Sequence, residues 1–301
     1  DAKSLRILLI EDSQTLEEVV VVGYGVQKKS VVTAAISKVT AQDLKNTSPT
    51  RVEDALKGKV SGVQITQSSG QPGSDSKVRI RGIGTVNNSD PLYIVDGMPV
   101  DGGIDYLNPV DIQSVEILKD AASAAIYGAR AANGVILVTT KSGLSGKTTI
   151  NYDVSYGWQN PWKKKSVLNA TEYMTVMNEA AINDGNSPKY TAEQIKNAGK
   201  GTDWQDETFN YDAPIESHQV SINGGTEKVT YFLSLGYLDQ EGIVGGDYGK
   251  SNFNRWSIRA NNTYNIYETN ERKFLNKVKV GINLGYSRAK SSGVETNSEY
   301  G

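Results

Sequence analysis

The sequence predicts an α+β unit of short elements, followed by a series of long antiparallel strands. From about residue 28 to residue 143, short strand and helix patterns alternate with turns. From residue 147 onward, apolar and polar residues alternate over long stretches, which is the pattern of strands with two different faces. The 30 glycines and 16 tyrosines among 301 residues also suit a β-rich protein, including a transmembrane barrel with a polar interior.

Composition excludes several classes of function. The net charge is only −2, so no nucleic-acid surface is indicated. The absence of cysteine excludes disulfide scaffolds, zinc fingers and thiol catalysis. No apolar run approaches the ~18 residues of a membrane-spanning helix.

Catalytic and metal-binding residues are also scarce. The single histidine, His218, is interpreted as a strand-end residue, which leaves a catalytic triad or a multi-histidine metal site without its members. Asp101 and Asp105 lack the spacing of a calcium-binding loop and are interpreted as solvated loop acids. We therefore expect no enzyme, no cofactor and no metal site.

A run of four valines near the N-terminus is a strong strand signal, because β-branched side chains fit a pleated surface. Residues 16–25 read LEEVVVVGYG, in which two acidic residues precede the valines. Such a segment can stay extended and unpaired and offer its backbone as an edge strand to another protein. A dinucleotide-binding fingerprint is rejected because Lys28 stands where the third glycine would be. A receiver domain starting at residues 6–12 is rejected because no alternating strand-helix units follow.

Short elements are expected throughout residues 28–143. Strands are predicted where apolar or alternating runs lie between turn residues: residues 31–40, 63–65, 78–81, 92–95, 114–119 and 134–140. A helix is predicted from residue 48 to about residue 57, with Thr50 and Glu53 as a capping box. Residues 120–127 predict a second helix, whose small side chains allow it to lie close against a sheet. A further apolar strand is expected at residues 4–10.

Five stretches beyond residue 147 alternate with period two: residues 150–158, 218–223, 229–237, 256–266 and 278–286. The wall of a transmembrane barrel alternates in this way, and so does a soluble antiparallel sheet with one dry face. The residues alone leave both alternatives open. Residues 160–216 form a connection too long for a hairpin turn, with a helix expected at residues 170–181 and Thr171 as its cap.

Several long, ordered motifs resemble one family. Residues 111–141 contain the runs VEILKDAAS, IYGARAANGVI and TTK, which resemble the plug-domain signature of TonB-dependent receptors. Residues 78–82 (VRIRG) and 91–97 (PLYIVDG) resemble the version of that plug found in SusC/RagA-like transporters of Bacteroidetes, and residues 16–25 resemble their TonB box. This resemblance favours the membrane barrel over the soluble sheet.

The resemblance implies an α+β plug domain followed by antiparallel strands of a large transmembrane β-barrel, with about five of roughly 22 strands present. Residues 1–15 would end an N-terminal β-sandwich extension, 16–27 would be the TonB box and linker, 28–145 the plug, and 146–301 the first barrel strands and an extracellular loop. Long loops are expected outside the cell, and the short turn at residues 224–227 on the periplasmic side. Because five strands cannot close around a plug, the chain is interpreted as the N-terminal part of a larger outer-membrane transporter.

The function implied by the resemblance is TonB-dependent import of an oligosaccharide or a peptide across the outer membrane. TonB would add a strand to the box, and a SusD-like lipoprotein would cap the barrel, whose outer face would contact outer-membrane lipid. The predicted TonB-binding residues are Glu17, Glu18, Val19, Val20, Val21, Val22 and Gly23. A plug loop expected to face the substrate contains Thr85, Asn87, Asn88 and Asp90.

Three alternatives remain open. The first is a siderophore or cobalamin receptor of the same superfamily. The second is a surface adhesin without transport, for which residues 18–23 would have no function. The third is a signal transducer, which would need an upstream signalling domain.

Overall fold

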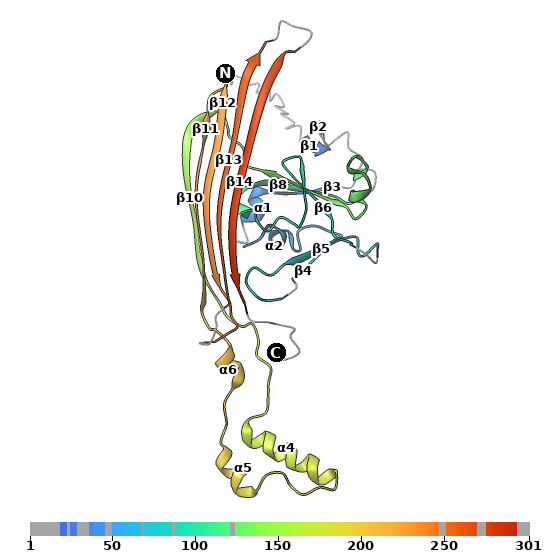
Figure 1. Cartoon of the computed structure of the whole chain (residues 1–301), viewed down its shortest axis with the longest axis vertical. Coiled ribbons are helices and arrows are strands. Elements are labelled where there is room, and N and C mark those ends of the chain that lie inside the picture. The colour runs from blue at the N-terminus through green and yellow to red at the C-terminus, as the bar shows by residue number, and fades with distance from the viewer. Residues whose placement is uncertain are drawn as a thin grey trace, which may run out of the picture.

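The computed structural model describes residues 19–22, 25–28, 36–45, 50–67, 69–85, 88–120, 124–246, 251–269 and 275–293. Two parts dominate these residues (Figure 1). Residues 36–140 form a mixed unit of short strands and helices, and the long strands β10–β14 form a strand wall (β10 Gly146–Gln159, β11 Ala213–Gly225, β12 Val229–Glu241, β13 Asn252–Glu268, β14 Lys277–Ser292). The predicted strand at residues 4–10 lies outside the described residues.

A five-stranded sheet is the centre of the mixed unit. Its strand order is β3-β8-β9-β6-β7, with bounds β3 Ile36–Thr40, β6 Leu92–Val95, β7 Met98–Val100, β8 Ile112–Leu118 and β9 Val135–Thr140. Strands β6 and β9 are parallel, and the other neighbouring pairs are antiparallel. The predicted strands at 92–95, 114–119 and 134–140 are therefore confirmed, and the described part of the predicted strand at 31–40 is β3.

Both faces of this sheet are covered, which explains why β6 is a continuous apolar run. Tyr93 and Val95 join one core cluster, which also includes Leu56 of the helix α2 (Val52–Leu56). Leu92 and Ile94 point to the opposite face and pack in a second cluster with the small residues Ala124 and Ala131 and their neighbours. The prediction that the small side chains of residues 120–127 lie close against the sheet is confirmed for Ala124.

A second, two-stranded sheet completes the mixed unit. Its strands β4 (Val63–Gln67) and β5 (Ser76–Ile80) are antiparallel, and the described part of the connection between them is a loop at residues 69–75. Ile65, Val78 and Ile80 connect this hairpin to the first core cluster. The hairpin is therefore attached to the main sheet by apolar contacts rather than by backbone hydrogen bonds.

The helix prediction at residues 48–57 is wrong in detail. Helix α2 begins after Arg51, which makes no side-chain cap, so the capping box predicted at Thr50 and Glu53 does not form. The helix predicted at residues 120–127 is only partly described: Ala124 N donates to Asp120 O at 3.1 Å, as in an α-helix, and the 3-10 segment η3 (Ala125–Ala131) follows, interrupted at Gly128. The φ of 71° and ψ of −160° at Gly128 belong to a region that only glycine adopts readily.

The strand wall is an antiparallel sheet in which neighbours in sequence are neighbours in space. All five predicted alternating stretches are strands, each longer than its sequence pattern. Strands β11 and β12 are joined by a short turn, with Thr226 N donating to Val229 O at 2.7 Å. His218, expected at a strand end, lies inside β11 because residues 213–217 also belong to that strand.

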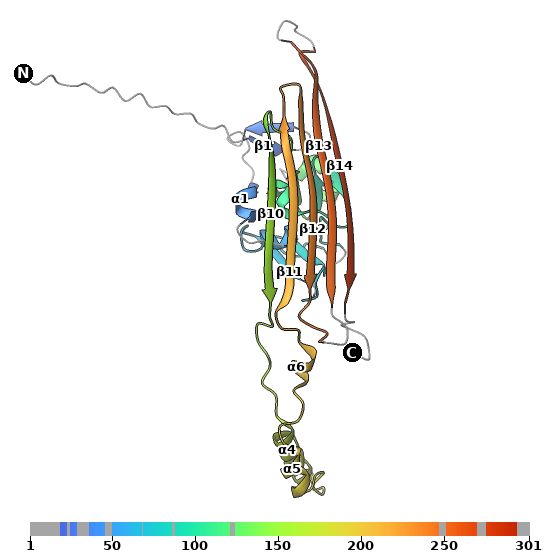
Figure 2. The ribbon, with the colours of Figure 1, turned by 90° about the vertical axis from the view of Figure 1, so that its left-hand side faces the viewer.

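The connection between β10 and β11 extends beyond the ends of the strands as a projecting arm, residues 160–212 (Figure 2). It contains α4 (Ala170–Asn183), α5 (Ala192–Ala198) and α6 (Trp204–Thr208). The predicted cap at Thr171 is wrong: Asn169 caps α4 in a capping box with Glu172, and the Thr171 hydroxyl donates to Gly199 O at 2.8 Å. Asn169 therefore satisfies the first free N–H groups of the helix.

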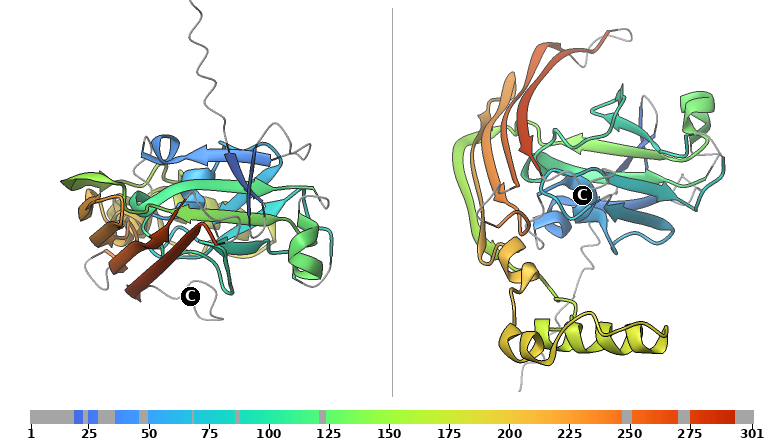
Figure 3. Two further views of the ribbon diagram at one scale, coloured as in Figure 1. Left: turned by 90° about the horizontal axis from the view of Figure 1, so that it is seen from above. Right: turned by 60° about the horizontal axis from the view of Figure 1, so that its bottom comes forward.

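The mixed unit lies against one face of the strand wall, as the view from above shows (Figure 3). The arm leaves one end of the wall. The small hairpin of β1 (Val19–Val22) and β2 (Gly25–Lys28) lies on the opposite side of the mixed unit from the arm (Figure 1). The structure therefore has one end marked by the arm and another marked by this hairpin.

Candidate functional site: the interface between the mixed unit and the strand wall

The strand wall has the reverse polarity of a soluble sheet. Large apolar side chains cover its outer face and are exposed, among them Ile150, Tyr152, Val154, Leu233, Leu235, Trp256, Ile258, Leu284 and Tyr286. Polar side chains occupy the inner face and are buried against the mixed unit: Gln219, Ser221, Ser234, Arg255, Ser257, Arg259 and Asn261. A soluble sheet would bury its apolar face. The observed arrangement is that of a barrel wall with a lipid face and a polar interior.

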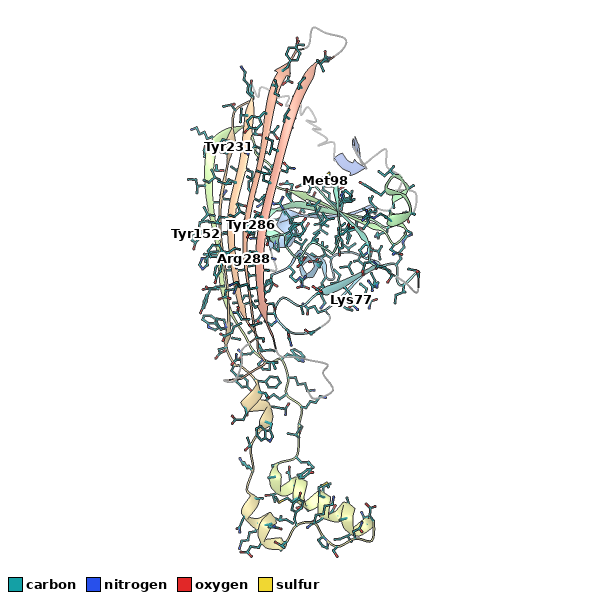
Figure 4. The ribbon with its side chains drawn as sticks, in the orientation of Figure 1. Lys77, Met98, Tyr152, Tyr231, Tyr286 and Arg288 are labelled. Atoms are coloured by element: carbon teal, nitrogen blue, oxygen red, sulfur yellow. The ribbon has the colours of Figure 1, made fainter. Side chains whose placement is uncertain are left out.

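Aromatic side chains stand along the outer face of the wall, with Tyr152 and Tyr286 at mid-height and Tyr231 toward the end opposite the arm (Figure 4). Toward the arm, the rings of Tyr237 and Trp256 lie 4.6 Å apart. Tyr231 lies toward the opposite end, and its hydroxyl is 2.6 Å from the Thr148 hydroxyl. Amphipathic rings at the two edges of an apolar band are typical of proteins that cross the outer membrane with strands.

The first polar anchor of the interface is built around Thr140 at the end of β9. Its hydroxyl donates to Asp96 Oδ2 at 2.7 Å, and its backbone N–H donates to Asp96 Oδ1 at 2.8 Å. From the wall, Asn261 Nδ2 donates to the same hydroxyl at 2.9 Å and to Lys141 O at 2.7 Å. Arg259 Nη1 lies 3.5 Å from Asp96 Oδ2. One threonine thus connects the carboxylate of the mixed unit to two side chains of the wall.

The positions of Asp96 and Thr140 follow from local structure. Asp96 and Gly97 form the turn between β6 and β7 with positive φ values of 49° and 86°. A two-residue turn of this kind matches the twist of a hairpin and is favoured by Asp-Gly. Because β6 and β9 are parallel neighbours, Val95 lies opposite Val138 and the two strand ends meet, which brings Asp96 beside Thr140.

The second anchor is the buried carboxylate of Asp111. Gln219 Nε2 of the wall donates to Asp111 Oδ1 at 2.5 Å, and Lys141 N donates to the Asp111 backbone oxygen at 2.8 Å. Burial raises the pKa of Asp111 above its usual range, although contacts with Ser234, Arg259 and Gln219 oppose this rise. Burial therefore makes the anionic form of Asp111 less favourable at the interface than it is in water.

The third anchor is Arg255, which reaches from β13 into the mixed unit. Its Nη1 donates to Asp105 O at 2.7 Å, and its Nη2 donates to Thr50 O at 3.2 Å. Near this contact, Arg51 and Glu53 are buried together, with Arg51 Nε 4.0 Å from Glu53 Oε2. Burial is also the main cause of the raised pKa of Glu53.

The mixed unit and the wall also make close contacts at the arm end of the wall, where the loop at residues 69–75 reaches β13 and β14. Ser291 Oγ donates to Pro72 O at 3.4 Å. A Cβ atom at Gly73 would lie 2.2 Å from Cδ2 of Phe253, and the positive φ of 74° at Gly73 further favours glycine there. Arg51 donates to the carbonyl oxygens of Gly73 and Ser74, so the loop is held from the mixed unit as well.

Polar contacts therefore account for most of the described anchors of this interface. A hydrogen bond contributes only about 0.5–1.5 kcal/mol net, because water replaces the partner when the groups separate. An interface of this kind can hold a domain in place and still release it into water. The sequence reasoning missed Gln219, Arg255, Arg259 and Asn261, although all four lie at polar positions of alternating strands.

The predicted TonB-binding residues are only partly described. Val19, Val20, Val21 and Val22 form β1, as expected for a strand, whereas Glu17, Glu18 and Gly23 lie outside the described residues. The expectation that this segment stays unpaired is wrong, because β1 pairs with β2 from Val19 opposite Lys28 to Val22 opposite Gly25. Among the strands that the structure describes, β1 pairs with β2 alone, so its other edge can accept a further strand.

The four residues of the predicted substrate loop do not share one place in the structure. Asn88 and Asp90 line a polar cavity of about 900 Å³ in the mixed unit, whereas Thr85 does not line this cavity and Asn87 lies outside the described residues. Asp90 pairs with Arg79 at 2.5 Å, and Asn88 Oδ1 accepts from Asp90 N at 2.8 Å. The two side chains therefore have a role in holding the loop, and contact with a substrate stays a prediction.

The single histidine and the described acidic side chains can be placed in the structure. His218 lies on the outer face of the wall, with its Nδ1 2.7 Å from the Tyr152 hydroxyl. Among the described residues, no group of three His, Asp or Glu side chains is placed to hold a metal ion. None of the described helices has the length and apolar character needed to cross a membrane.

Comparison with known proteins agrees with this geometry. Residues 28–135 match the family model of the TonB-dependent receptor plug domain. The TonB-dependent receptor SusC of Bacteroides thetaiotaomicron is 34% identical over 310 aligned residues, which cover 100% of this chain and 29% of that protein. The TonB-dependent receptor P26 of Formosa agariphila is 37% identical over 92% of this chain and 27% of its own length.

A solved structure described as the RagAB peptide importer in its open-open state is also similar. It has a TM-score of 0.78 and 31% identity, and the alignment covers 92% of this chain and 33% of that chain. This chain thus spans about a third, or less, of the length of these relatives. The mixed unit is a plug domain, the strand wall is part of a transmembrane β-barrel, and the chain belongs to the SusC/RagA-like TonB-dependent transporters.

Proposed function

We propose that the full-length protein imports a nutrient, either an oligosaccharide or a peptide, across the outer membrane with energy delivered by TonB. The observation that carries this proposal is the polarity of the strand wall, whose outer face is apolar and whose inner face binds the plug through hydrogen bonds. A plug held in this way blocks the lumen at rest. It can be displaced without exposing a large apolar surface.

The energy enters through the N-terminal segment. TonB adds a strand to the free edge of β1, the edge that β2 does not occupy. Each backbone hydrogen bond contributes about 1 kcal/mol net, so the attachment is modest at rest. When TonB pulls along the direction of the strand, all of these hydrogen bonds must break together. The attachment therefore withstands a force large enough to displace part of the plug. The arm at residues 160–212 marks the extracellular side, because long connections of such barrels lie outside the cell.

A SusD-like lipoprotein covers the extracellular mouth and captures the cargo first. Support for this partner comes from the similarity to SusC and to the RagAB peptide importer. This similarity does not distinguish an oligosaccharide from a peptide as the substrate.

The test is deletion of residues 18–23 from the full-length gene, with surface expression measured in parallel. We expect normal surface expression and loss of growth on one glycan or peptide as the nutrient source. Loss of growth only under iron or cobalamin limitation would instead indicate a siderophore or cobalamin receptor. Unchanged growth on every source would refute energised transport and favour an adhesin.

Contact with TonB can be tested separately. The chain contains no cysteine, so Val20→Cys introduces a single thiol within it. We expect disulfide cross-linking of this variant to cysteine variants of the periplasmic TonB domain. Ser155→Cys, on the inner side of β10 far along the chain, is the matched control and should not cross-link.

A further inference from the structure

A second cavity, of about 390 Å³, lies between the plug and the wall at the arm end of the strands. The plug contributes the loop at residues 69–74 together with Gln67, and the wall contributes Gln159 and Gln240 near the ends of β10 and β12. Its volume falls within the range of small-ligand sites, roughly 300–1,000 Å³. Because the arm end is the proposed extracellular side, cargo arriving from outside meets this cavity before it meets the rest of the plug.

The lining of this cavity is rich in neutral hydrogen-bonding groups. Five side chains are carboxamides: Gln67, Gln71, Gln159, Asn160 and Gln240. Thr50, Ser69 and Ser74 add hydroxyl groups. The charged lining residues are Arg51 and Asp54, and Arg51 already donates to the carbonyl oxygens of Gly73 and Ser74. The surface is therefore polar and nearly neutral.

Two of the carboxamides retain capacity for a ligand. Gln240 Nε2 donates to Gln159 Oε1 at 3.2 Å. A carboxamide has two N–H donors and two acceptor lone pairs, so one bond between these two side chains uses only a small part of their capacity. Asn160 has a different role: it exchanges two hydrogen bonds of 2.8 Å with Asp212 and joins the two ends of the arm.

We propose that this cavity is a binding subsite for a neutral oligosaccharide, a proposal that rests on the proposed function and names its substrate class. Sugar hydroxyls both donate and accept, and carboxamides offer both functions side by side. A peptide brings apolar side chains and charged ends, whereas the apolar side chains of this lining are Pro72 and Ile243. An anionic polysaccharide would need cations, and the single lining cation, Arg51, is already engaged by backbone carbonyls and carboxylates.

The test uses the full-length transporter and measures binding calorimetrically in detergent. The probes are neutral hexasaccharides of glucose, xylose and mannose, together with hexagalacturonate and hexaalanine. We expect at least one neutral hexasaccharide to bind, and Gln159→Leu and Gln240→Leu each to weaken it about 10-fold, because each change leaves a sugar hydroxyl unpaired. Gln113→Leu, which changes an exposed glutamine of β8 outside this cavity, is the matched control and should leave binding unchanged.

Several outcomes would overturn the proposal. These are binding of hexagalacturonate or hexaalanine in place of the neutral sugars, no binding of any neutral hexasaccharide at millimolar concentration, or binding unaffected by both leucine variants. If a variant fails to reach the surface, Gln240→Cys in a cysteine-free background replaces it. The bound neutral sugar should then protect that thiol from maleimide labelling, and absence of protection would also overturn the proposal.

Failure of this subsite is distinguishable from failure of the proposed function. If growth depends on residues 18–23 but the cargo is a peptide, TonB-dependent import stands and only the oligosaccharide subsite is refuted. If growth never depends on residues 18–23, import itself is refuted.

Discussion

Thr140→Val removes one hydroxyl from the centre of the first plug anchor without a change of side-chain shape. That hydroxyl donates to Asp96 Oδ2 at 2.7 Å and accepts from Asn261 at 2.9 Å. Loss of a hydrogen bond to a charged group costs about 1.5–3 kcal/mol, and loss of a neutral one costs about 1 kcal/mol. We therefore expect the free energy that holds the end of β9 against the wall to fall by about 3 kcal/mol.

Hydrogen–deuterium exchange of the full-length protein measures this loss, because local opening controls exchange of protected amides. The reporters are the N–H groups of Thr140 and Asp96, which donate to Asp96 Oδ1 and Val138 O respectively. A loss of about 3 kcal/mol corresponds to exchange roughly 100-fold faster.

The matched control is Thr139→Val, the same chemical change at the preceding residue of β9. Its side chain makes no hydrogen bond to any residue that the structure describes. Unchanged exchange in the Thr140 variant would refute the reasoning, and so would equal acceleration in both variants.

Three further predictions test other parts of the structure. Gly73→Ala should lower the melting temperature of the full-length protein and loosen its loop, because the new Cβ would lie 2.2 Å from the ring of Phe253 at a positive φ; an unchanged melting temperature would contradict this contact. Asp111 has a raised pKa, so its contribution to stability is present at low pH and falls as pH rises through that raised value. Asp111→Asn should therefore remove this part of the pH dependence and raise the melting temperature at neutral pH, while equal pH profiles for the two proteins would count against the assignment. Leu235→Arg on the outer face should destabilise folding into lipid vesicles by about 2–4 kcal/mol, whereas Val229→Arg near the strand end should cost about 0–1 kcal/mol; equal costs in urea titrations would argue against a lipid-facing surface.

Local patterns predicted most elements of the fold. The alternation in the second half of the chain predicted all five strands of the wall, since side chains of a strand point to opposite faces in turn. The apolar run of residues 92–95 also predicted β6, because this pattern depends on a few neighbouring residues. Predictions of helix starts failed where several neighbouring residues could act as the N-cap. Asn169 caps α4 in place of Thr171, and α2 has no side-chain cap.

The predicted site residues fared differently. The valine run is a strand, but its pairing with β2 could not be predicted from the run itself, because any exposed strand edge can accept several partners. Asn88 and Asp90 line a cavity, and yet Asp90 is already paired with Arg79, a residue 11 positions away whose approach depends on the β5 strand.

The sequence by itself determined the period of the strands, the apolar character of one set of alternating residues, and the motifs that mark a plug. The alternation alone left undecided which set of side chains faces inward, because a soluble sheet and a barrel wall alternate identically; the plug motifs favoured the barrel only through their resemblance to a family. The tertiary structure shows the orientation directly, because it buries Gln219, Arg255, Arg259 and Asn261 against the plug and leaves the apolar set exposed. The physical reason is that a strand face becomes the inner face only when another part of the protein packs against it. The partners of these four side chains lie more than 100 residues away in the chain, so no local pattern reveals them.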